Sequence, residues 1–160
     1  MTPAKRVLFV CMGNICRSPT GEGVFRDYVK KQGLGDSIQV DSAGTIGAHA
    51  GEPPDARMRR AARARGYELD GKARQFTAAD FDAFDLIVAM DRANYRDILA
   101  RDPDGSHAAK VKLLCSFNPK AKTQDVPDPY YGGPQGFEEV LDLIEGACEG
   151  ILASLQEKPD

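Results

Sequence analysis

The sequence predicts an α/β fold, a doubly wound parallel sheet of four strands with helices on both faces, and three observations carry this prediction. Short apolar runs typical of buried strands alternate along the chain with helical patterns. Residues 86–90 are continuously apolar, as expected for a central parallel strand covered on both faces. Residues 137–155 carry apolar side chains at helical spacing throughout. Because no linker, repeat or low-complexity tract divides the chain, we expect residues 1–160 to form a single domain.

The first strand and the loop after it contain the candidate site. Residues 7–10 form a short apolar run, and Cys11 follows directly. Gly13 and Asn14 tolerate positive φ and therefore suit a tightly wrapped loop. Ser18, followed by proline, is predicted to be the N-cap of a helix. Cys11 is thus expected at the carboxyl end of a strand whose loop runs into a helix N-terminus, the place where open α/β sheets bind ligands.

This placement has chemical consequences. A helix start attracts anions, and the same field, with Arg17 nearby, favours the thiolate of Cys11. A thiolate beside a pocket for a tetrahedral dianion is a nucleophile aimed at phosphorus. Arg17 can hold two phosphoryl oxygens in a fork that lysine cannot copy, and Ser18 can donate a hydrogen bond to the departing sulfur. The predicted phosphate-binding residues are Met12, Gly13, Asn14, Ile15, Cys16 and Ser18.

The next elements alternate as the fold class requires. A helix is predicted over residues 20–32, ended by Gly33, and a second strand over residues 38–44. A further helix opens at Asp55 and stops at Gly66. It carries the most basic patch of the chain, which we interpret as a solvated helix face, with a binding site for an acidic partner as the alternative. Its arginines are Arg57, Arg59, Arg60, Arg63 and Arg65.

The second half continues the pattern. Residues 77–80 resemble a capping box that opens a short helix, and a helix around residues 95–99 follows the third strand. A fourth strand is predicted over residues 111–117. Residues 118–135 form a long irregular loop, and such loops inside compact domains tend to be functional.

Composition excludes several classes of protein. The net charge of −3 provides no basic field for nucleic acid or for an anionic membrane. No stretch approaches the ~20 apolar residues of a membrane span, and no signal-peptide pattern is present. We therefore expect a cytoplasmic monomer that binds neither nucleic acid nor membrane.

The four cysteines do not form a metal or disulfide pattern. There is no Cys-x2-Cys pair, and neither His49 nor His107 stands at ligand spacing, so no metal and no cofactor is expected. Cys115 and Cys148 fall on apolar patterns and are interpreted as small buried side chains. Cys11 and Cys16 remain as thiols with a functional role.

Two motifs carry a family resemblance. Cys11-Met-Gly-Asn-Ile-Cys-Arg-Ser-Pro, joined to Asp128-Pro-Tyr-Tyr-Gly downstream, resembles the low-molecular-weight protein tyrosine phosphatases. A bare Cys-x5-Arg arises often by chance, but the combination of both motifs is specific. The resemblance runs nearly end to end and implies strand order 2-1-3-4. Its further matches are residues 41–45, 51–53, 73–75 and 89–91.

The resemblance implies a reaction, namely hydrolysis of phosphotyrosine and small aryl phosphates through a phosphocysteine. The substrate would be a tyrosine-phosphorylated protein, and phosphate or vanadate would inhibit. Cys11 is then the nucleophile, Arg17 the phosphate clamp and Asp128 the general acid and base. Tyr130 and Tyr131 would form walls for the phenyl ring, although one of them can equally pack inward.

Ser42 and Asp91 receive roles from the same resemblance, whereas the role of Cys16 follows from the curl of the loop, which brings positions 11 and 16 close together. Ser42 is expected to support the phosphate loop by a hydrogen bond. Asp91 is placed near the loop, with a simple helix cap as its alternative. Cys16 is expected to protect Cys11 from irreversible oxidation by forming a disulfide, with packing beneath the loop as the alternative.

The chain departs from the family pattern at two positions. Ala48 stands before His49 where many members carry an aromatic residue at the pocket rim. Gly71 stands where a histidine commonly supports the loop asparagine. The support of Asn14 must therefore come from another residue, for which Ser42 is the candidate.

Three other interpretations fit parts of the same pattern. Thiol-dependent arsenate reductases share the loop but need a further cysteine pair near the third strand, and residues 86–99 contain no cysteine. A phosphotyrosine-binding module without activity is disfavoured because Cys11, Arg17 and Asp128 are all present. In the third, Cys11 is merely a buried structural thiol.

Overall fold

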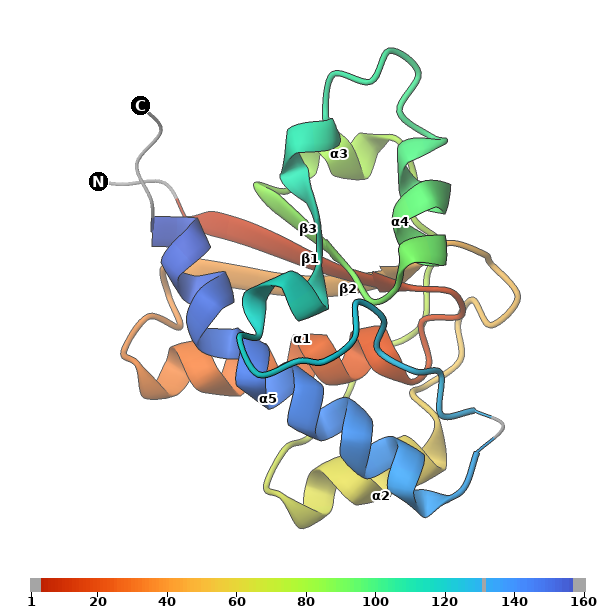
Figure 1. The fold of residues 1–160 in the computed structure, drawn as a ribbon, viewed down its shortest axis with the longest axis vertical. Coiled ribbons are helices and arrows are strands. Elements are labelled where there is room, and N and C mark those ends of the chain that lie inside the picture. The colour runs from red at the N-terminus through yellow and green to blue at the C-terminus, as the bar shows by residue number, and fades with distance from the viewer. Residues whose placement is uncertain (1–3, 131, 157–160) are drawn as a thin grey trace.

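The computed structural model describes residues 4–130 and 132–156, and its centre is a parallel sheet (Figure 1). The strands are β1 (Lys5–Cys11), β2 (Ile38–Gly44), β3 (Leu86–Ala89) and β4 (Val111–Leu113). They pair in parallel in the order β2-β1-β3-β4. The predicted fold class and the order 2-1-3-4 are therefore confirmed.

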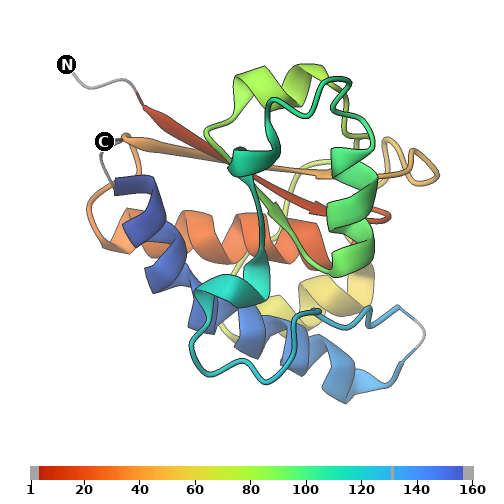
Figure 2. The same ribbon diagram turned by 45° about the horizontal axis from the view of Figure 1, so that its top comes forward.

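Helices cover both faces of the sheet, as a doubly wound fold requires (Figures 1 and 2). On one face lie α1 (Arg17–Lys31), α2 (Ala56–Ala64) and α5 (Pro134–Gln156). On the other lie α3 (Ala79–Ala83) and α4 (Arg92–Leu99). Alternate residues of β1 divide between the two layers: Phe9 belongs to the core under α1 and α5, and Leu8 to the core under α3 and α4.

Close packing of α1 on the sheet depends on a glycine. A Cβ at Gly21 would lie 2.7 Å from the Phe9 ring and 2.8 Å from Met90 Cε. The poor helix former at this position is therefore tolerated because it lets α1 approach the strands. The approach matters for function, since the N-terminus of α1 lies at the end of β1.

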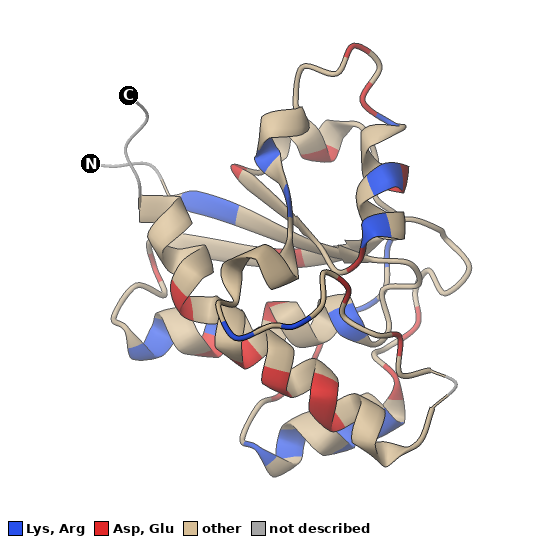
Figure 3. Ribbon diagram, in the orientation of Figure 1, with Lys and Arg blue, Asp and Glu red and all other residues tan. Residues whose placement is uncertain are grey.

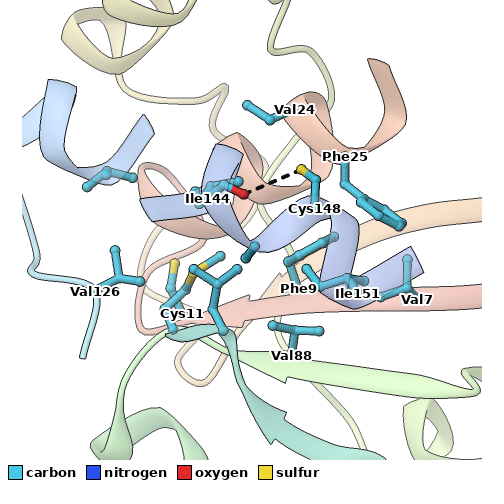
Figure 4. Close-up of a cluster of buried hydrophobic side chains, with 14 of the residues drawn as sticks. Val7, Phe9, Cys11, Val24, Phe25, Val88, Val126, Ile144, Cys148 and Ile151 are labelled. Atoms are coloured by element: carbon cyan, nitrogen blue, oxygen red, sulfur yellow. Dashed lines mark hydrogen bonds between the residues drawn. The ribbon is translucent and has the colours of Figure 1, made fainter. Parts of the chain in front are cut away.

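The core between α5 and β1 contains a buried cysteine thiol that only packs against its neighbours (Figure 4). Cys148 donates a hydrogen bond to the Ile144 carbonyl over 3.4 Å, beside Phe9 and Ile151. Burial raises the pKa of Cys148 to about 12, so it stays a neutral thiol. Cys115 is buried as well. Both positions are as the sequence predicts.

The start of α1 differs from the prediction. The helix begins at Arg17, and Cys16 occupies the N-cap position without a side-chain hydrogen bond. Ser18 is the second helical residue instead of the N-cap, because its hydroxyl is engaged with Cys11 Sγ at 3.0 Å. The helix end follows expectation, with Gly33 at φ +77°.

Two other predicted elements need correction. The fourth strand ends at Leu113 and gives way to a 3-10 helix, η2 (Leu114–Phe117). The ladder with β3 ends at Leu113, and Leu114 and Cys115 are both buried within the 3-10 turn that follows. The capping box at residues 77–80 is half formed: the Asp80 carboxylate accepts the Thr77 N–H at 2.9 Å, while α3 begins at Ala79.

The connection after α4 is held by a histidine whose charge should affect stability. His107 hydrogen-bonds the buried carboxylate of Asp102 at 3.0 Å and the exposed carboxylate of Asp82 at 3.2 Å, and its ring stacks on Phe81. The bond to Asp102 raises the pKa of His107. Asp104 lies close enough to share a metal ion with Asp102 and His107, but both ring nitrogens of the histidine are already engaged.

We predict a pH-dependent loss of stability in His107→Asn. Because the folded state holds the imidazole proton more tightly, the contribution is full below the ordinary pKa near ~6.5 and is lost as pH rises through the raised folded value. The difference in thermal unfolding between wild type and variant should therefore be largest at pH 5.5 and shrink in alkaline buffer to the part that the stacking on Phe81 contributes. A difference that does not change with pH would contradict the charge assignment.

Candidate active site

The loop between β1 and α1 wraps around the sulfur of Cys11. Asn14 adopts φ +58° and points its backbone N–H at Cys11 Sγ over 3.3 Å. Gly13 does not use positive φ. A Cβ at Gly13 would lie 3.1 Å from the His49 ring, so a larger residue there would require this ring to shift.

Ser18 is arranged to donate to the same sulfur. Asn14 Nδ2 donates to Ser18 Oγ over 2.8 Å, so the oxygen acts as acceptor there and its own hydrogen is available for Cys11. A hydroxyl 3.0 Å from the sulfur stabilises the thiolate. The carboxyl end of β1 and the N-terminus of α1 together place Cys11 in an anion-binding setting.

Arg17 lies beside the loop with its guanidinium fixed from two sides. Nη1 donates to Asp91 Oδ2 over 2.6 Å and to the Val126 carbonyl over 3.0 Å. Burial opposes its charge, but the Cys11 sulfur and the Asp91 carboxylate outweigh burial and raise the pKa of Arg17. The side chain, 4% exposed, is therefore a permanent buried cation aimed at the site.

Asp91 contacts the loop arginine and also caps the next helix, the two positions that the sequence offered as alternatives. Besides binding Arg17, it caps α4 in a reciprocal capping box with Asn94. The cap fixes the carboxylate, and the carboxylate fixes the guanidinium.

Asp128 approaches from the long loop after η2. Its Oδ2 lies 3.8 Å from Arg17 Nη2, and its Oδ1 accepts the Tyr130 N–H over 3.1 Å. The loop is tied to α2 by Arg57, which donates to the Tyr130 carbonyl over 3.0 Å and stands over the Tyr130 ring. Tyr131, the second predicted wall, lies outside the described residues.

These side chains enclose a cavity of about 60 Å³. Asn14 and Ser18 lie behind its wall, within the hydrogen-bond network, while the other predicted loop residues face it. The lining residues are Cys11, Met12, Gly13, Ile15, Cys16, Arg17, His49, Asp128 and Tyr130.

His49 is a lining residue that the sequence prediction missed. The His49 imidazole lies at the cavity, and its ring centre is 6.4 Å from that of Tyr130. The neighbouring Ala48 does not line the cavity. Nδ1 of His49 is hydrogen-bonded to Glu52. The aromatic residue one position after Ala48 was the available signal.

A second network supports the loop from behind. Asn14 Nδ2 donates to Ser42 Oγ over 3.0 Å, and Ser42 Oγ donates to Glu22 Oε1 over 2.6 Å. Asn14 Oδ1 accepts the Arg74 N–H over 3.0 Å. Gly71, at φ +91°, has nothing within 4 Å of the point where a Cβ would stand, so Ser42 and Glu22 supply the support from the sheet and from α1.

We predict that Ser42→Ala weakens this support. Asn14 would lose one acceptor in a buried site, which costs about 1–3 kcal/mol of unfolding free energy. A misplaced loop should also lower kcat roughly 10- to 100-fold. Thermal unfolding and steady-state kinetics test this, with Ser116→Ala as the control, because Ser116 is exposed and bonds only its local backbone. Equal effects of both substitutions would contradict the supporting role.

The fold and the site together define a class: an α/β protein with a cysteine thiol and a buried arginine in one loop at the carboxyl edge of its sheet. Residues 6–160 match the family model described as low molecular weight phosphotyrosine protein phosphatase. The chain belongs to this family, whose members are hydrolases, and the resemblance noted in the sequence is confirmed.

Individual proteins agree with this assignment. The chain is 48% identical to a low molecular weight protein-tyrosine-phosphatase of Streptomyces coelicolor, covering 96% of this chain and 94% of that protein. It is 42% identical to the human low molecular weight phosphotyrosine protein phosphatase, over 92% and 94% of the two chains. The crystal structure of a protein tyrosine phosphatase from Entamoeba histolytica, with Hepes in its active site, superposes with a TM-score of 0.92 at 42% identity, covering 96% and 97%.

Among the described residues, no helix is long and apolar enough to cross a membrane.

Proposed function

We propose that this protein hydrolyses phosphotyrosine, and small aryl phosphates, through a phosphocysteine intermediate and without a metal ion. One observation carries the proposal: Cys11, Arg17 and Asp128 line the same small cavity. The charge of the Arg17 guanidinium interacts with the Cys11 sulfur, and its Nη2 atom lies 3.8 Å from the Asp128 carboxylate. Tyrosine-phosphorylated proteins are the proposed substrates, because that is what members of the family are named for.

The first step transfers the phosphoryl group. The Cys11 thiolate attacks phosphorus, an S–P bond forms, and the bond from phosphorus to the tyrosine oxygen breaks. Asp128, protonated at this stage, gives its proton to the leaving phenolate. Arg17 and the backbone N–H groups of the loop hold the remaining oxygens as their charge redistributes.

The second step returns the enzyme to its starting state. Water attacks the phosphorus, Asp128 accepts the proton of that water, and the S–P bond breaks. Ser18 stabilises the departing thiolate through its hydrogen bond. Inorganic phosphate leaves, and Asp128 is again protonated for the next turnover.

Substrate choice follows from the wall of the cavity. Tyr130 offers an aromatic face beside Asp128, and His49 faces it across the rim. A long aryl phosphate reaches the sulfur between such walls, whereas a phosphoserine is too short. Tyr131 is proposed as a second wall.

Hydrolysis of p-nitrophenyl phosphate in mildly acidic buffer with EDTA tests the proposed function. We expect turnover that EDTA does not change and that phosphate or vanadate inhibits. Arsenate reduction with a thiol donor is the rival reaction, and its presence without phosphatase activity would overturn the proposal. So would tight binding of phosphotyrosine without turnover.

Further proposals concern the whole chain. We propose that residues 1–160 form one domain that acts as a monomer in the cytoplasm. The four cysteines are all free thiols, as is usual in a reducing compartment.

Cys16 is proposed to protect the nucleophile. Peroxide converts the Cys11 thiolate to a sulfenic acid, and attack by Cys16 sulfur forms a disulfide and releases water. Burial, with Asp55 as the next cause, raises the pKa of Cys16 to about 12, so it stays a neutral thiol until that attack. Both cysteines line the same cavity.

The protective role predicts a difference in recovery from oxidation. After peroxide inactivation and dithiothreitol, wild type should regain most of its activity, whereas Cys16→Ser should regain little. Cys115→Ser, a buried thiol outside the cavity, serves as the control and should recover like wild type. Full recovery of Cys16→Ser would reduce Cys16 to a packing residue.

A further inference from the structure

A groove lies between α2 and α5, next to the candidate active site but separate from it. It encloses about 550 Å³. The residues that line it, and that define the α2–α5 groove, are Arg57, Arg60, Ala61, Ala64, Gly132, Gly133, Pro134, Phe137 and Glu138.

Arg57 separates the groove from the catalytic cavity. Its guanidinium stands 5.4 Å from the centre of the Tyr130 ring, a wall of the cavity, and 5.1 Å from that of Phe137, a wall of the groove. A chain that leaves the cavity over Tyr130 therefore meets the groove directly. At about 3.3 Å per extended residue, positions within roughly three to five residues of a phosphotyrosine would reach it.

The charges that line the groove do not cancel. Arg57 is paired with Asp55, and Glu138 is paired with Arg65 at 2.7 Å. Arg65 also pairs with Asp142 and Glu145, neighbouring acids of α5, so its single positive charge offsets part of the negative charge of three carboxylates (Figure 3). Arg60 is exposed and has no ion pair or hydrogen bond within the described part of the chain. Its charge is the one that remains available.

The floor of the groove is apolar. Ala61 and Ala64 on α2 and Pro134 at the start of α5 offer small apolar side chains, while Phe137, 4% exposed and covered by Arg57, contributes only an edge. An extended segment with an apolar residue beside an acidic one would bury the first on this floor and place the second on Arg60.

We propose that the α2–α5 groove binds an acidic segment of the phosphoprotein substrate that flanks the phosphotyrosine. The proposal rests on the proposed function and adds sequence selectivity to it. The basic face of α2 is then a substrate-binding surface, the alternative to a merely solvated helix face.

Two phosphotyrosyl peptides that differ only in their flanks test the proposal. One carries Glu and the other Lys at the positions three to five residues from the phosphotyrosine, on both sides. Wild type should hydrolyse the Glu peptide with a kcat/KM roughly tenfold higher, as expected for one charge-assisted contact, and 1 M salt should remove the difference. Arg60→Glu should abolish or reverse the preference.

Arg63→Glu is the matched control. Arg63 lies on the same helix but outside the groove and is paired with Glu68, so its substitution should leave the peptide preference intact. Hydrolysis of p-nitrophenyl phosphate, which has no flank, should be unchanged in both variants. Equal use of the two peptides by wild type, or an unchanged preference in Arg60→Glu, would overturn the groove proposal alone. Failure of wild type to hydrolyse any of the three compounds would overturn the proposed function and the groove with it.

Discussion

Cys11→Ser is expected to abolish turnover of aryl phosphates, with a loss of about five to six orders of magnitude in kcat. A serine hydroxyl stays protonated where a thiol is readily ionised, and no carboxylate or imidazole among the described residues is hydrogen-bonded to the atom at this position. Within that part of the chain, the sulfur accepts the Asn14 N–H and shares a hydrogen bond with the Ser18 hydroxyl, and it has no other hydrogen-bond partner.

The same variant should still bind anions, which distinguishes a lost nucleophile from a lost fold. The loop N–H groups, Arg17 and the α1 N-terminus remain in place, so vanadate or phosphate should bind within a few-fold of the wild-type affinity by calorimetry. Cys148→Ser, a buried thiol that does not line the cavity, controls for the substitution itself. A Cys11→Ser enzyme within tenfold of wild-type activity would exclude the phosphocysteine mechanism.

The sequence predicts those parts of the fold that local patterns determine. The apolar runs of β1 and β3 and the periodicity of α5 are sufficient to identify these elements. Strand order is a matter of long-range pairing, so only the family resemblance supplies it. The sequence predicts that the fourth strand continues past Leu113, where the structure has a 3-10 helix. Leu114 and Cys115 are both apolar, so the sequence does not show whether the chain stays extended or turns there. What packs against these residues decides it.

The same reasoning explains what the sequence reveals of the site. Cys11 and Arg17 lie within one loop, so their proximity is local and can be predicted. The N-cap prediction for Ser18 is wrong. It assumes that the hydroxyl hydrogen-bonds a backbone N–H of the helix, whereas here the hydroxyl hydrogen-bonds the Cys11 sulfur, seven residues earlier. The sequence gives no sign of Glu22 or of the Val126 carbonyl, since each reaches the site through contacts that no spacing encodes.

Asp128→Asn is expected to reduce kcat by roughly 10²–10⁴-fold on phosphotyrosine and other esters with poor leaving groups. The amide cannot donate the proton that a phenolate of high pKa needs as its bond to phosphorus breaks. For an activated ester such as p-nitrophenyl phosphate, whose leaving oxygen is stable as an anion, the loss in the first step should be much smaller.

The comparison across leaving groups is what identifies the acid, and a matched variant removes the structural explanation. Asp125→Asn changes a carboxylate in the same loop that pairs with Arg92 and does not line the cavity, so it should leave the dependence on the leaving group as in wild type. For Asp128→Asn, single-turnover kinetics give the rate constant for formation of the intermediate with each ester. The logarithm of this rate constant, plotted against the pKa of the leaving group, should fall steeply. A uniform loss across all esters, with the wild-type slope retained, would mean that Asp128 holds the loop through its bond to the Tyr130 N–H and its proximity to Arg17 and does not transfer the proton.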